Sequence, residues 1–365
     1  MTEKDRHFTN YPLETAFDEM FDSSLNVRET YERYRLFLND LSLDNLQELQ
    51  TATDQAQRLM GMTFQVHGDE RGLEKVLQLD IIPRIISDRE WKIIEGGLRQ
   101  RIKALNLFIQ DIYHGQKILK DDVVPEHLIL TCPDYLRQCK GLEPPRGIWI
   151  HITGTDIVRD AEGTFRILED NLRCPSGVSY MLENRKIIKA TFPNAFDQIH
   201  VQPVNVYPQI LHRMLEYIAP ASPATIVVLT PGIYNSAFYE HSYLAQEMGV
   251  ELVEGRDLVV KNDFVYMRTT AGLQKVDVIY RRIDDKFLDP VHFNSESMLG
   301  VPGLFDAYRK GHVALANAPG TGVADDKAIY PFVPDIIKYY LNEVLEQVVK
   351  FHLFVPHLHQ NLFQN

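Results

Sequence analysis

Residues 167–177, which read ILEDNLRCPSG, combine side chains that could bind a cation and an anion. Glu169, Asp170 and Asn171 end an apolar, strand-like segment, and Arg173 follows two residues later. Charged groups are costly to bury unless they are paired or bind a ligand. Two interpretations follow. Either these side chains neutralise residues of the same chain, or they hold a metal ion and an anionic group together.

The preceding segment supplies a further oxygen-bearing side chain. Residues 147–171 are rich in β-branched and aromatic residues and are interrupted by Asp-Ala-Glu-Gly at 160–163, which predicts two antiparallel strands joined by a short turn. With this turn, Asp156 is expected opposite Ile167, and side chains alternate between the two faces from there. One face is then predicted to carry Asp156, Val158, Phe165, Ile167, Glu169 and Asn171.

The oxygen atoms on that face suit Mg²⁺, which takes one or two carboxylates and completes its shell with water and phosphate. Arg173 could contact a phosphate oxygen with two parallel hydrogen bonds. The alternative is that Glu169 or Asp170 pairs with Arg166 or Arg173 at the surface, which would contribute about 0–1 kcal/mol.

The composition limits the classes of protein that the chain can represent. Its 365 residues, 45% hydrophobic and 24% charged, suffice for two or three packed domains. A net charge of −12 argues against a nucleic-acid-binding surface. The three cysteines have neither disulfide-framework nor zinc-ligand spacing, and no apolar run approaches the ~20 residues that cross a bilayer. The first ten residues lack a signal-peptide core. We therefore expect a cytoplasmic protein without a nucleic-acid or membrane partner.

The first 140 residues are predicted to be largely helical. Ser87 and Glu90 form a capping-box pattern, and apolar residues follow at steps of three and four. These spacings predict one long amphipathic helix with a buried face made of Trp91, Ile94, Leu98, Ile102, Leu105, Ile109 and Ile112.

A Pro/Ala/Ser linker at 219–225 precedes a pattern of alternating strands and helices. A buried strand at 226–229 leads into a helix that ends at Gly249, and a second strand begins at Val250. This order indicates a parallel sheet and a Rossmann-like domain. Residues 276–285, VDVIYRRIDD, predict another strand, which ends in charged residues. Because ligands bind at such strand ends, Arg281 and Arg282 are candidate substrate or phosphate contacts.

Four long motifs in order carry a resemblance to a known family. They are residues 154–185, 229–260, 276–290 and 314–341. Over roughly residues 60–340 the chain resembles the circularly permuted ATP-grasp type 2 proteins, relatives of glutathionylspermidine synthetase. The resemblance implies a mixed α/β (α+β) fold: a circularly permuted ATP-grasp with a Rossmann-like pre-ATP-grasp domain and a helical N-terminal region.

The resemblance and the composition shifts together predict four regions. A mostly helical region would span 1–140, and an ATP-grasp portion with the metal-site hairpin would span 141–219. The Rossmann-like domain would span 220–315. Residues 316–365 would form a partial second ATP-grasp portion with an atypical tail.

The resemblance also implies a site that holds ATP and Mg²⁺. In the related enzyme class an Asp on one strand and a Glu-x-Asn on the next hold Mg²⁺, and the matching positions are Asp156, Glu169 and Asn171. An Arg two residues before that Asp is replaced by Gly154, so Arg173 becomes the candidate catalytic cation. The remaining predicted ATP contacts are Lys327, which resembles a helix-starting lysine of the relatives, together with Arg281, Arg282, Ser176 and Gly177. The loop 317–322, NAPGTG, is expected to be flexible and able to approach a ligand.

The implied reaction is that of a Mg·ATP-dependent carboxylate–amine ligase, which acts through an acyl phosphate on a small-molecule or peptide substrate. No Gly-rich loop follows Lys350, so the comparison with the family also predicts that much of the C-terminal ATP-grasp half is missing. Two alternatives stay open. The first is a binding or scaffold protein that has lost catalysis. The second is a sugar-nucleotide enzyme in which Ile-Asp-Asp at 283–285 forms a metal–diphosphate site.

Overall fold

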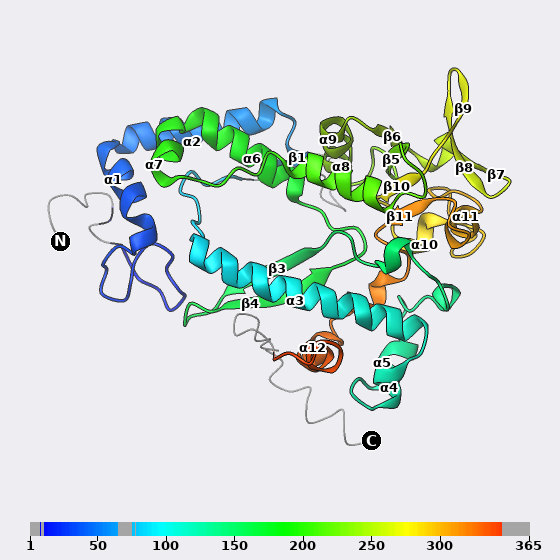
Figure 1. The fold of residues 1–365 in the computed structure, drawn as a ribbon. Helices are drawn as coiled ribbons and strands as arrows, with labels where there is room; N and C mark the ends of the chain where they lie inside the picture. Colours follow the sequence, from blue (N-terminus) through cyan, green and yellow to red (C-terminus); the bar gives the residue numbers. More distant parts are fainter. Residues whose placement is uncertain (1–7, 9–10, 65–74, 77, 345–365) are drawn as a thin grey trace.

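A computed structural model describes residues 8, 11–64, 75–76 and 78–344. The chain is a mixture of helices and short sheets, as the sequence predicts. Helices form an upper layer in Figure 1, the long helix α3 runs below them, and a small parallel sheet lies beside both. Lys350 and the rest of residues 345–365, which include the predicted atypical tail, lie outside the described residues. None of the described helices is long and apolar enough to cross a membrane.

Helix α3 spans Asp88–Tyr113 and confirms the predicted amphipathic helix. Ser87 accepts a hydrogen bond from the Glu90 N–H, and the Glu90 side chain accepts one from the Ser87 N–H. The buried face runs from Ile94 to Tyr113, and α12 (Val333–Leu341) packs against it. The prediction was wrong for Trp91, which is 52% exposed because the first turn of α3 extends beyond the core.

The parallel sheet confirms the predicted Rossmann-like unit. Its strand order is β11-β10-β5-β6, and every neighbouring pair is parallel. The strands are β5 (Ile226–Leu229), β6 (Glu251–Val253), β10 (Val278–Arg281) and β11 (Ala314–Ala316). Helix α9 (Phe238–Met248) joins β5 to β6 and ends at Gly249, whose φ of 69° suits a residue without a side chain.

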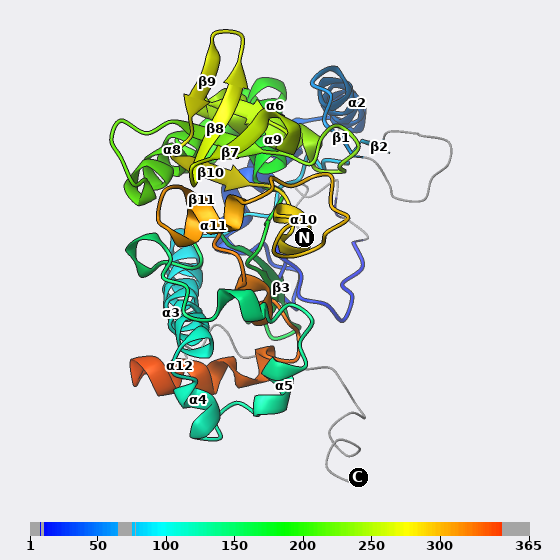
Figure 2. The same ribbon diagram turned by 90° about the vertical axis from the view of Figure 1, so that its right-hand side faces the viewer.

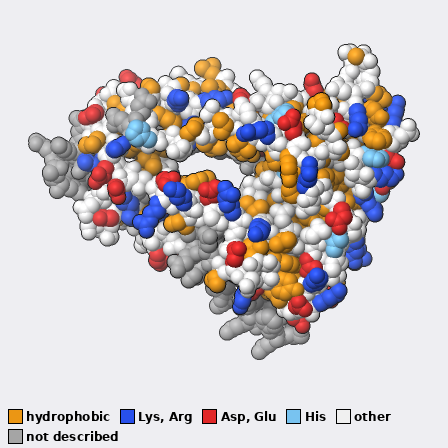
Figure 3. Space-filling view, in the orientation of Figure 1, with side chains coloured by type: hydrophobic (Ala, Val, Ile, Leu, Met, Phe, Trp, Pro, Cys, Tyr) orange, Lys and Arg blue, Asp and Glu red, His pale blue; other side chains and the backbone are white. Residues whose placement is uncertain are grey.

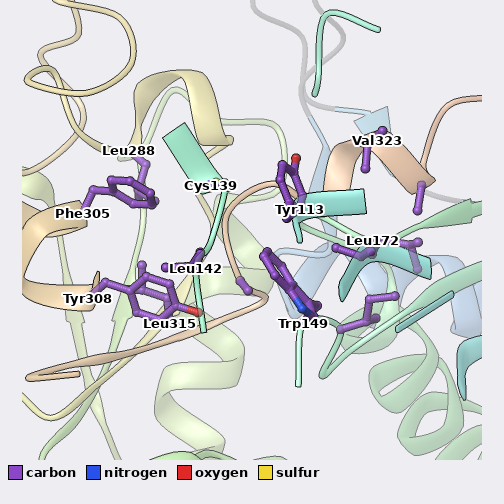
Figure 4. Packing of buried hydrophobic residues seen from close by; sticks show 14 of the residues in the cluster. Tyr113, Cys139, Leu142, Trp149, Leu172, Leu288, Phe305, Tyr308, Leu315 and Val323 are labelled. Carbon is purple, nitrogen blue, oxygen red and sulfur yellow. The ribbon is translucent and has the colours of Figure 1, made fainter. Parts of the chain in front are cut away.

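Two hydrophobic clusters cover the two faces of this sheet. On one face, α8 (Tyr207–Ile218) and α9 pack against Val228 and Tyr280. On the other face, α11 (Leu304–Arg309) joins residues from the end of α3, and Figure 4 shows Tyr113 and Trp149 near Leu315 of β11. The rings of Tyr113 and Trp149 stack with centroids 5.1 Å apart. This shared core ties α3 to the sheet.

An antiparallel ribbon beside the sheet was not predicted. It contains β7 (Leu258–Lys261), β8 (Phe264–Thr269) and β9 (Gly272–Lys275), and Figure 2 shows it standing off the sheet. The turn at Asn262 and Asp263 has positive φ at both residues, 50° and 67°. That dipeptide between apolar runs was a hairpin signal available in the sequence.

Helices that follow the predicted metal-site hairpin in the chain pack with the N-terminal helices. Helix α6 (Val178–Thr191) lies against α2 (Leu43–Leu59), and α7 (Pro193–Ile199) lies against α1 (Glu32–Asp40). In the orientation of Figure 1, an opening separates this upper layer from α3 and the hairpin (Figure 3). The remaining elements are the antiparallel pair β1 (Thr63–Phe64) and β2 (Lys75–Val76) and the short helices α4 (Lys117–Lys120), α5 (Glu126–Leu130) and α10 (Asp285–Leu288).

Candidate functional site

The predicted hairpin consists of β3 (Gly154–Arg159) and β4 (Phe165–Asn171) in antiparallel pairing. Its turn is where the sequence predicts it, and the Gly163 N–H donates to the Asp160 carbonyl at 2.9 Å. Asp156 pairs with Glu169, whereas the next residue, Ile157, pairs with Ile167. The predicted pairing of Asp156 with Ile167 is therefore wrong, because a β-bulge places an extra residue in β4.

The bulge decides which side chains share a face. Directly opposed residues point to the same side, so Asp156, Val158, Glu169 and Asn171 share the outward face as predicted. Phe165 and Ile167 were predicted there, but they belong to the other face, where Ile167 is buried together with Asp170. The outward face also exposes Val158 and Leu168, which are 40% and 50% accessible.

Two carboxylates meet on the outward face. Burial and the neighbouring Glu169 raise the pKa of Asp156, and the two side chains are in hydrogen-bonding contact. Lys327 Nζ lies 2.9 Å from Glu169 Oε2, and this hydrogen bond lowers the pKa of Glu169. Asn171 Nδ2 donates to the Gly154 carbonyl at 3.3 Å, which holds the amide group beside the two acids. Lys327, a predicted ATP contact, is thus paired with a predicted metal ligand.

These residues fit a magnesium ion. Two contacting carboxylates repel each other when both are ionised, and a divalent cation relieves that repulsion. Within the described ranges no three His, Cys, Asp or Glu side chains cluster around a common metal position. A pair of carboxylates with one amide oxygen is nevertheless a donor set that Mg²⁺ accepts, since phosphate and water complete its shell. The metal-binding role of the three residues stays a prediction.

Asp170 lies on the buried face and has a structural partner. Arg101 of α3 donates from Nε to Asp170 Oδ2 at 2.7 Å, and both side chains are at most 1% exposed. Thr155 Oγ1 donates to Asp170 Oδ1 at 2.9 Å, and the Asp170 N–H donates to Tyr330 Oη at 3.0 Å. The expected surface pair with Arg166 or Arg173 is therefore wrong for Asp170. This network holds the back of the hairpin against α3.

Arg173, the predicted catalytic cation, lies among three carboxylates. Its Nε is 2.8 Å from Asp325, and its Nη1 is 3.0 Å from Asp284 and 3.5 Å from Asp134. Burial raises the pKa of Asp325 to about 6 even though Arg173 lowers it. Arg173 thus joins the end of β4 to the loops that contain Asp284 and Asp325. To bind a phosphate group, Arg173 would have to release one of these carboxylates.

Arg281 is buried in the loop region at the end of β10. Its Nε donates to the Asn317 carbonyl at 2.6 Å, and Nη1 lies 2.8 Å from Asp285 Oδ1. Nη2 donates to the Ala318 carbonyl at 3.1 Å, and the side chain is fully buried. Because the side chain is buried in these contacts, Arg281 exposes no N–H group for the predicted contact with a phosphate.

Two further predicted ATP contacts, Arg282 and Gly177, bind one carboxylate, that of Glu240, and a third, Ser176, binds Arg282. Glu240 Oε2 accepts from the N–H groups of Gly177 and Ser179 at 2.7 and 3.1 Å, at the start of α6. Glu240 Oε1 accepts from Arg282 Nη2 at 2.9 Å, and the same nitrogen donates to Ser176 Oγ at 2.8 Å. Glu240 therefore occupies the N–H groups at the start of α6, beside the predicted ATP contacts Ser176 and Gly177.

The loop 317–322 is buried, so the expectation of a flexible, ligand-facing loop is wrong. Asn317 Oδ1 accepts from the N–H groups of His151 and Ile152 at 2.6 and 2.9 Å. Asn317 Nδ2 donates to the carbonyls of Ile152 and Leu172 at 2.7 and 2.8 Å. The loop thereby links β11 to the segments on both sides of the hairpin.

Sequence reasoning missed Arg101, Glu240 and Asn317 as residues that hold the site. For Arg101 a signal existed: the spacing 94, 98, 101, 105 places a guanidinium on the apolar face of a helix, which requires a buried acceptor. For Glu240 and Asn317 the local sequence offers no comparable signal, since their partners are brought together only by the fold.

Comparisons with known proteins agree with this architecture. The family model of the circularly permuted ATP-grasp type 2 proteins matches residues 83–364. An uncharacterized protein of Synechocystis is 53% identical over 337 residues, which are 92% of this chain and 70% of that protein. An uncharacterized protein of Mycobacterium tuberculosis is 49% identical over 333 residues, 90% of this chain and 59% of that protein.

More distant relatives carry functional names. A Frankia alni protein, provisionally named a glutamate–cysteine ligase, is 38% identical over 341 residues, which cover 91% of this chain and 39% of that protein. A glutathione synthetase-like effector of Globodera pallida, solved in its apo form, matches with a TM-score of 0.55 over 83% of this chain and 69% of its own. At 12% identity this match shows the fold alone. The chain thus spans only part of these relatives, and it belongs to the circularly permuted ATP-grasp type 2 family.

Proposed function

We propose that the chain is the part of a Mg·ATP-dependent carboxylate–amine ligase that carries the metal-binding hairpin. The observation that carries the proposal is the contact between Asp156 and Glu169 on the exposed face of β3 and β4. Two acidic side chains in contact are unfavourable for the folded chain alone. They become favourable when a divalent cation lies between them and an anionic ligand.

The rear of the hairpin supports this proposal. The buried pair of Arg101 and Asp170 holds β4 to α3, so the alternate residues Glu169 and Asn171 are held outward. A binding site works best when its ligands are held rigidly before the ligand arrives. Here Asp170, on the buried side of β4, holds the strand in place through its contact with Arg101.

The proposed chemistry is the activation of a carboxylate by ATP. The terminal phosphoryl group passes to the substrate carboxylate, ADP leaves, and an amine then displaces phosphate to form an amide bond. Mg²⁺, when bound, would neutralise the charge of the phosphate groups. Asp156, Glu169 and Asn171 would hold the ion, and Lys327, which lies beside Glu169, would neutralise a phosphate oxygen.

The names of relatives support a ligase. The relative of Frankia alni and a similar one of Frankia casuarinae are both provisionally named glutamate–cysteine ligases. We propose a small-molecule or peptide carboxylate and an amine as the substrates, and the cytoplasm as the place of the reaction. Because this chain covers 39% of either Frankia protein, the activity of the whole relative comes to it only as a proposal.

A second candidate is a protein that binds Mg·ATP or a related ligand without turning it over. It is favoured by the internal partners of the other predicted phosphate contacts. Arg281 is buried on Asp285, and Arg282 is buried on Glu240. The sugar-nucleotide alternative is disfavoured by the same geometry, since Asp285 is buried and accepts from the Gly320 N–H at 3.0 Å.

Isothermal titration calorimetry of the 365-residue chain with Mg·ATP tests both candidates. The variant combines Asp156→Asn with Glu169→Gln, which keeps the shape of both side chains and removes their charges. Glu162→Gln, at the exposed turn of the same hairpin, is the matched control. Binding that is lost in the double variant and kept in the control supports the site.

The same samples separate the two candidates. Phosphate release from ATP in the presence of pooled amino acids and short peptides would favour the ligase. Saturable binding without phosphate release would favour the second candidate. Absence of binding by the folded wild-type chain would contradict both.

A further inference from the structure

A pocket that shares no lining residue with the hairpin lies between α6, α8 and α9. It is a cavity of about 320 Å³ that extends from Leu182 of α6 to Pro208 of α8 and Tyr243 of α9. The loop 201–205 closes one side. None of the residues predicted to bind ATP or Mg²⁺ lines it. Its volume is at the lower end of the range for small-molecule sites.

The pocket is basic, although the chain as a whole has a net charge of −12. Arg185, Lys186 and Lys189 line it from one helix, and Glu247 is the carboxylate among the lining residues. Lys186 is neutralised, because its Nζ lies 2.8 Å from Glu183 and 3.2 Å from Glu247. The positive charge of the pocket therefore comes from Arg185 and Lys189.

Arg185 and Lys189 have no carboxylate partner among the residues whose side chains the structure describes. Arg185 Nη1 donates to the Gln202 carbonyl at 2.8 Å, and its guanidinium lies over the Phe196 ring at 5.5 Å. Burial lowers the pKa of Arg185. Lys189 lies one turn further along α6 on the same face, since residues four apart are neighbours on a helix.

The walls of the pocket are apolar and aromatic. Phe196 of α7 and Tyr243 of α9 supply two aromatic rings, and Lys186 Nζ lies 5.1 Å from the Tyr243 ring centroid. Leu182, Val201 and Val204 complete the apolar lining. A ligand of this pocket must therefore have an apolar group that fills the cavity and a negative charge that pairs with the two cations.

We propose that this pocket binds a small organic anion, in which an apolar or aromatic body fills the cavity and one carboxylate or phosphate group contacts Arg185 and Lys189. The planar guanidinium provides paired hydrogen bonds to such a group, and the ammonium adds a second positive charge. The site is independent of the proposed ligase chemistry, since it shares no lining residue with the hairpin.

Ligand-observed saturation-transfer NMR with phenyl phosphate as the probe tests the proposal. Inorganic phosphate supplies the charge without the ring, and phenol supplies the ring without the charge. The variant is Arg185→Gln with Lys189→Gln. The matched control is Arg99→Gln with Lys103→Gln, which removes two cations at the same spacing from the exposed surface of α3.

Phenyl phosphate is expected to bind the wild-type chain and the control alike, with about tenfold weaker binding by the Arg185/Lys189 variant. Both comparator molecules should bind more weakly than the probe. Circular dichroism must show that each variant is folded. Equal binding by the two double variants, or no binding by the wild-type chain at millimolar probe, would overturn the proposal.

Discussion

Asp156 and Glu169 lie directly opposite each other across the β3–β4 hairpin, and each changes the ionisation of the other. Asp156 holds its proton more tightly than a free aspartate, because it is partly buried and adjoins Glu169. Glu169 is kept ionised by Lys327 and by the hydrogen bond from Asp156. When both side chains are ionised, the two carboxylates repel each other, and a bound cation would relieve that repulsion.

Removing the repulsion between Asp156 and Glu169 should stabilise the folded chain in the absence of metal. Asp156→Asn is expected to raise the free energy of unfolding in EDTA by a few tenths of a kcal/mol, because one of two repelling carboxylates is lost at a solvent-exposed site. Urea denaturation followed by circular dichroism measures the change. Asp160→Asn in the same hairpin is the control and should be destabilising, since Asp160 Oδ2 lies 2.6 Å from Arg166 Nη2. A lower stability for Asp156→Asn would contradict the electrostatic interpretation.

Arg101 and Asp170 should be among the most sensitive positions in the chain. Arg101→Met leaves a buried carboxylate without its partner and is expected to cost about 3–5 kcal/mol of unfolding free energy. Combining it with Asp170→Leu should cost less than the sum of the two single changes, because no buried charge is left unpaired. A double-mutant cycle in guanidinium chloride checks this, and additive effects would show that the pair does not interact.

Lys327 competes with a metal ion for Glu169, according to the proposed site. Lys327→Met is expected to tighten the binding of Mn²⁺ alone by about two- to fivefold, because the carboxylate loses its internal counter-ion. Binding of Mg·ATP should weaken, since a cation near the phosphates is lost. Electron paramagnetic resonance of free Mn²⁺ measures the first effect and calorimetry the second. Lys338→Met on α12 is the control; unchanged affinities in both assays would remove Lys327 from the site.

His241 should make the chain sensitive to acid. Thr230 Oγ1 and His241 Nδ1 are 2.9 Å apart in a buried position, and burial together with the charge of Arg282 lowers the pKa of His241 to about 3. A histidine whose pKa is lowered by folding stabilises the native state above its unfolded pKa of about 6.5, and this contribution is lost as the pH falls. Between about pH 7.5 and pH 5.5 the loss amounts to about 1.4 kcal/mol.

The variant His241→Gln should show a correspondingly smaller loss over the same interval in urea denaturation. His127→Gln, at an exposed position of α5, should behave as the wild type. The difference between wild type and variant cancels other titrating groups, among them Asp325, whose raised pKa opposes the loss. If the unfolding free energies of the wild type and His241→Gln fall equally with pH, the loss does not come from His241.

Local patterns in the sequence were sufficient to predict several helices, strands and turns. The start of α3 follows from Ser87 and Glu90, which lie three residues apart and satisfy each other within one turn. The turn of the hairpin and the order β5, α9, β6 follow from residues that are adjacent in the chain. Glu169 and Asn171 share the outward face because alternation along a strand is a local property, and Asp156 joins them through the pairing of β3 with β4.

The partners of the charged residues could not be predicted in this way. Asp170 pairs with Arg101, 69 residues away, and Arg282 pairs with Glu240, 42 residues away. The bulge in β4 has a similar origin: it turns Ile167 and Asp170 together toward α3, where one fills the core and the other meets Arg101. Residue types and spacing determined the elements and the oxygen atoms available to a cation. Only the tertiary structure decided which charges are neutralised internally, because a buried charge is stable solely beside the particular partner that the packing of distant segments provides.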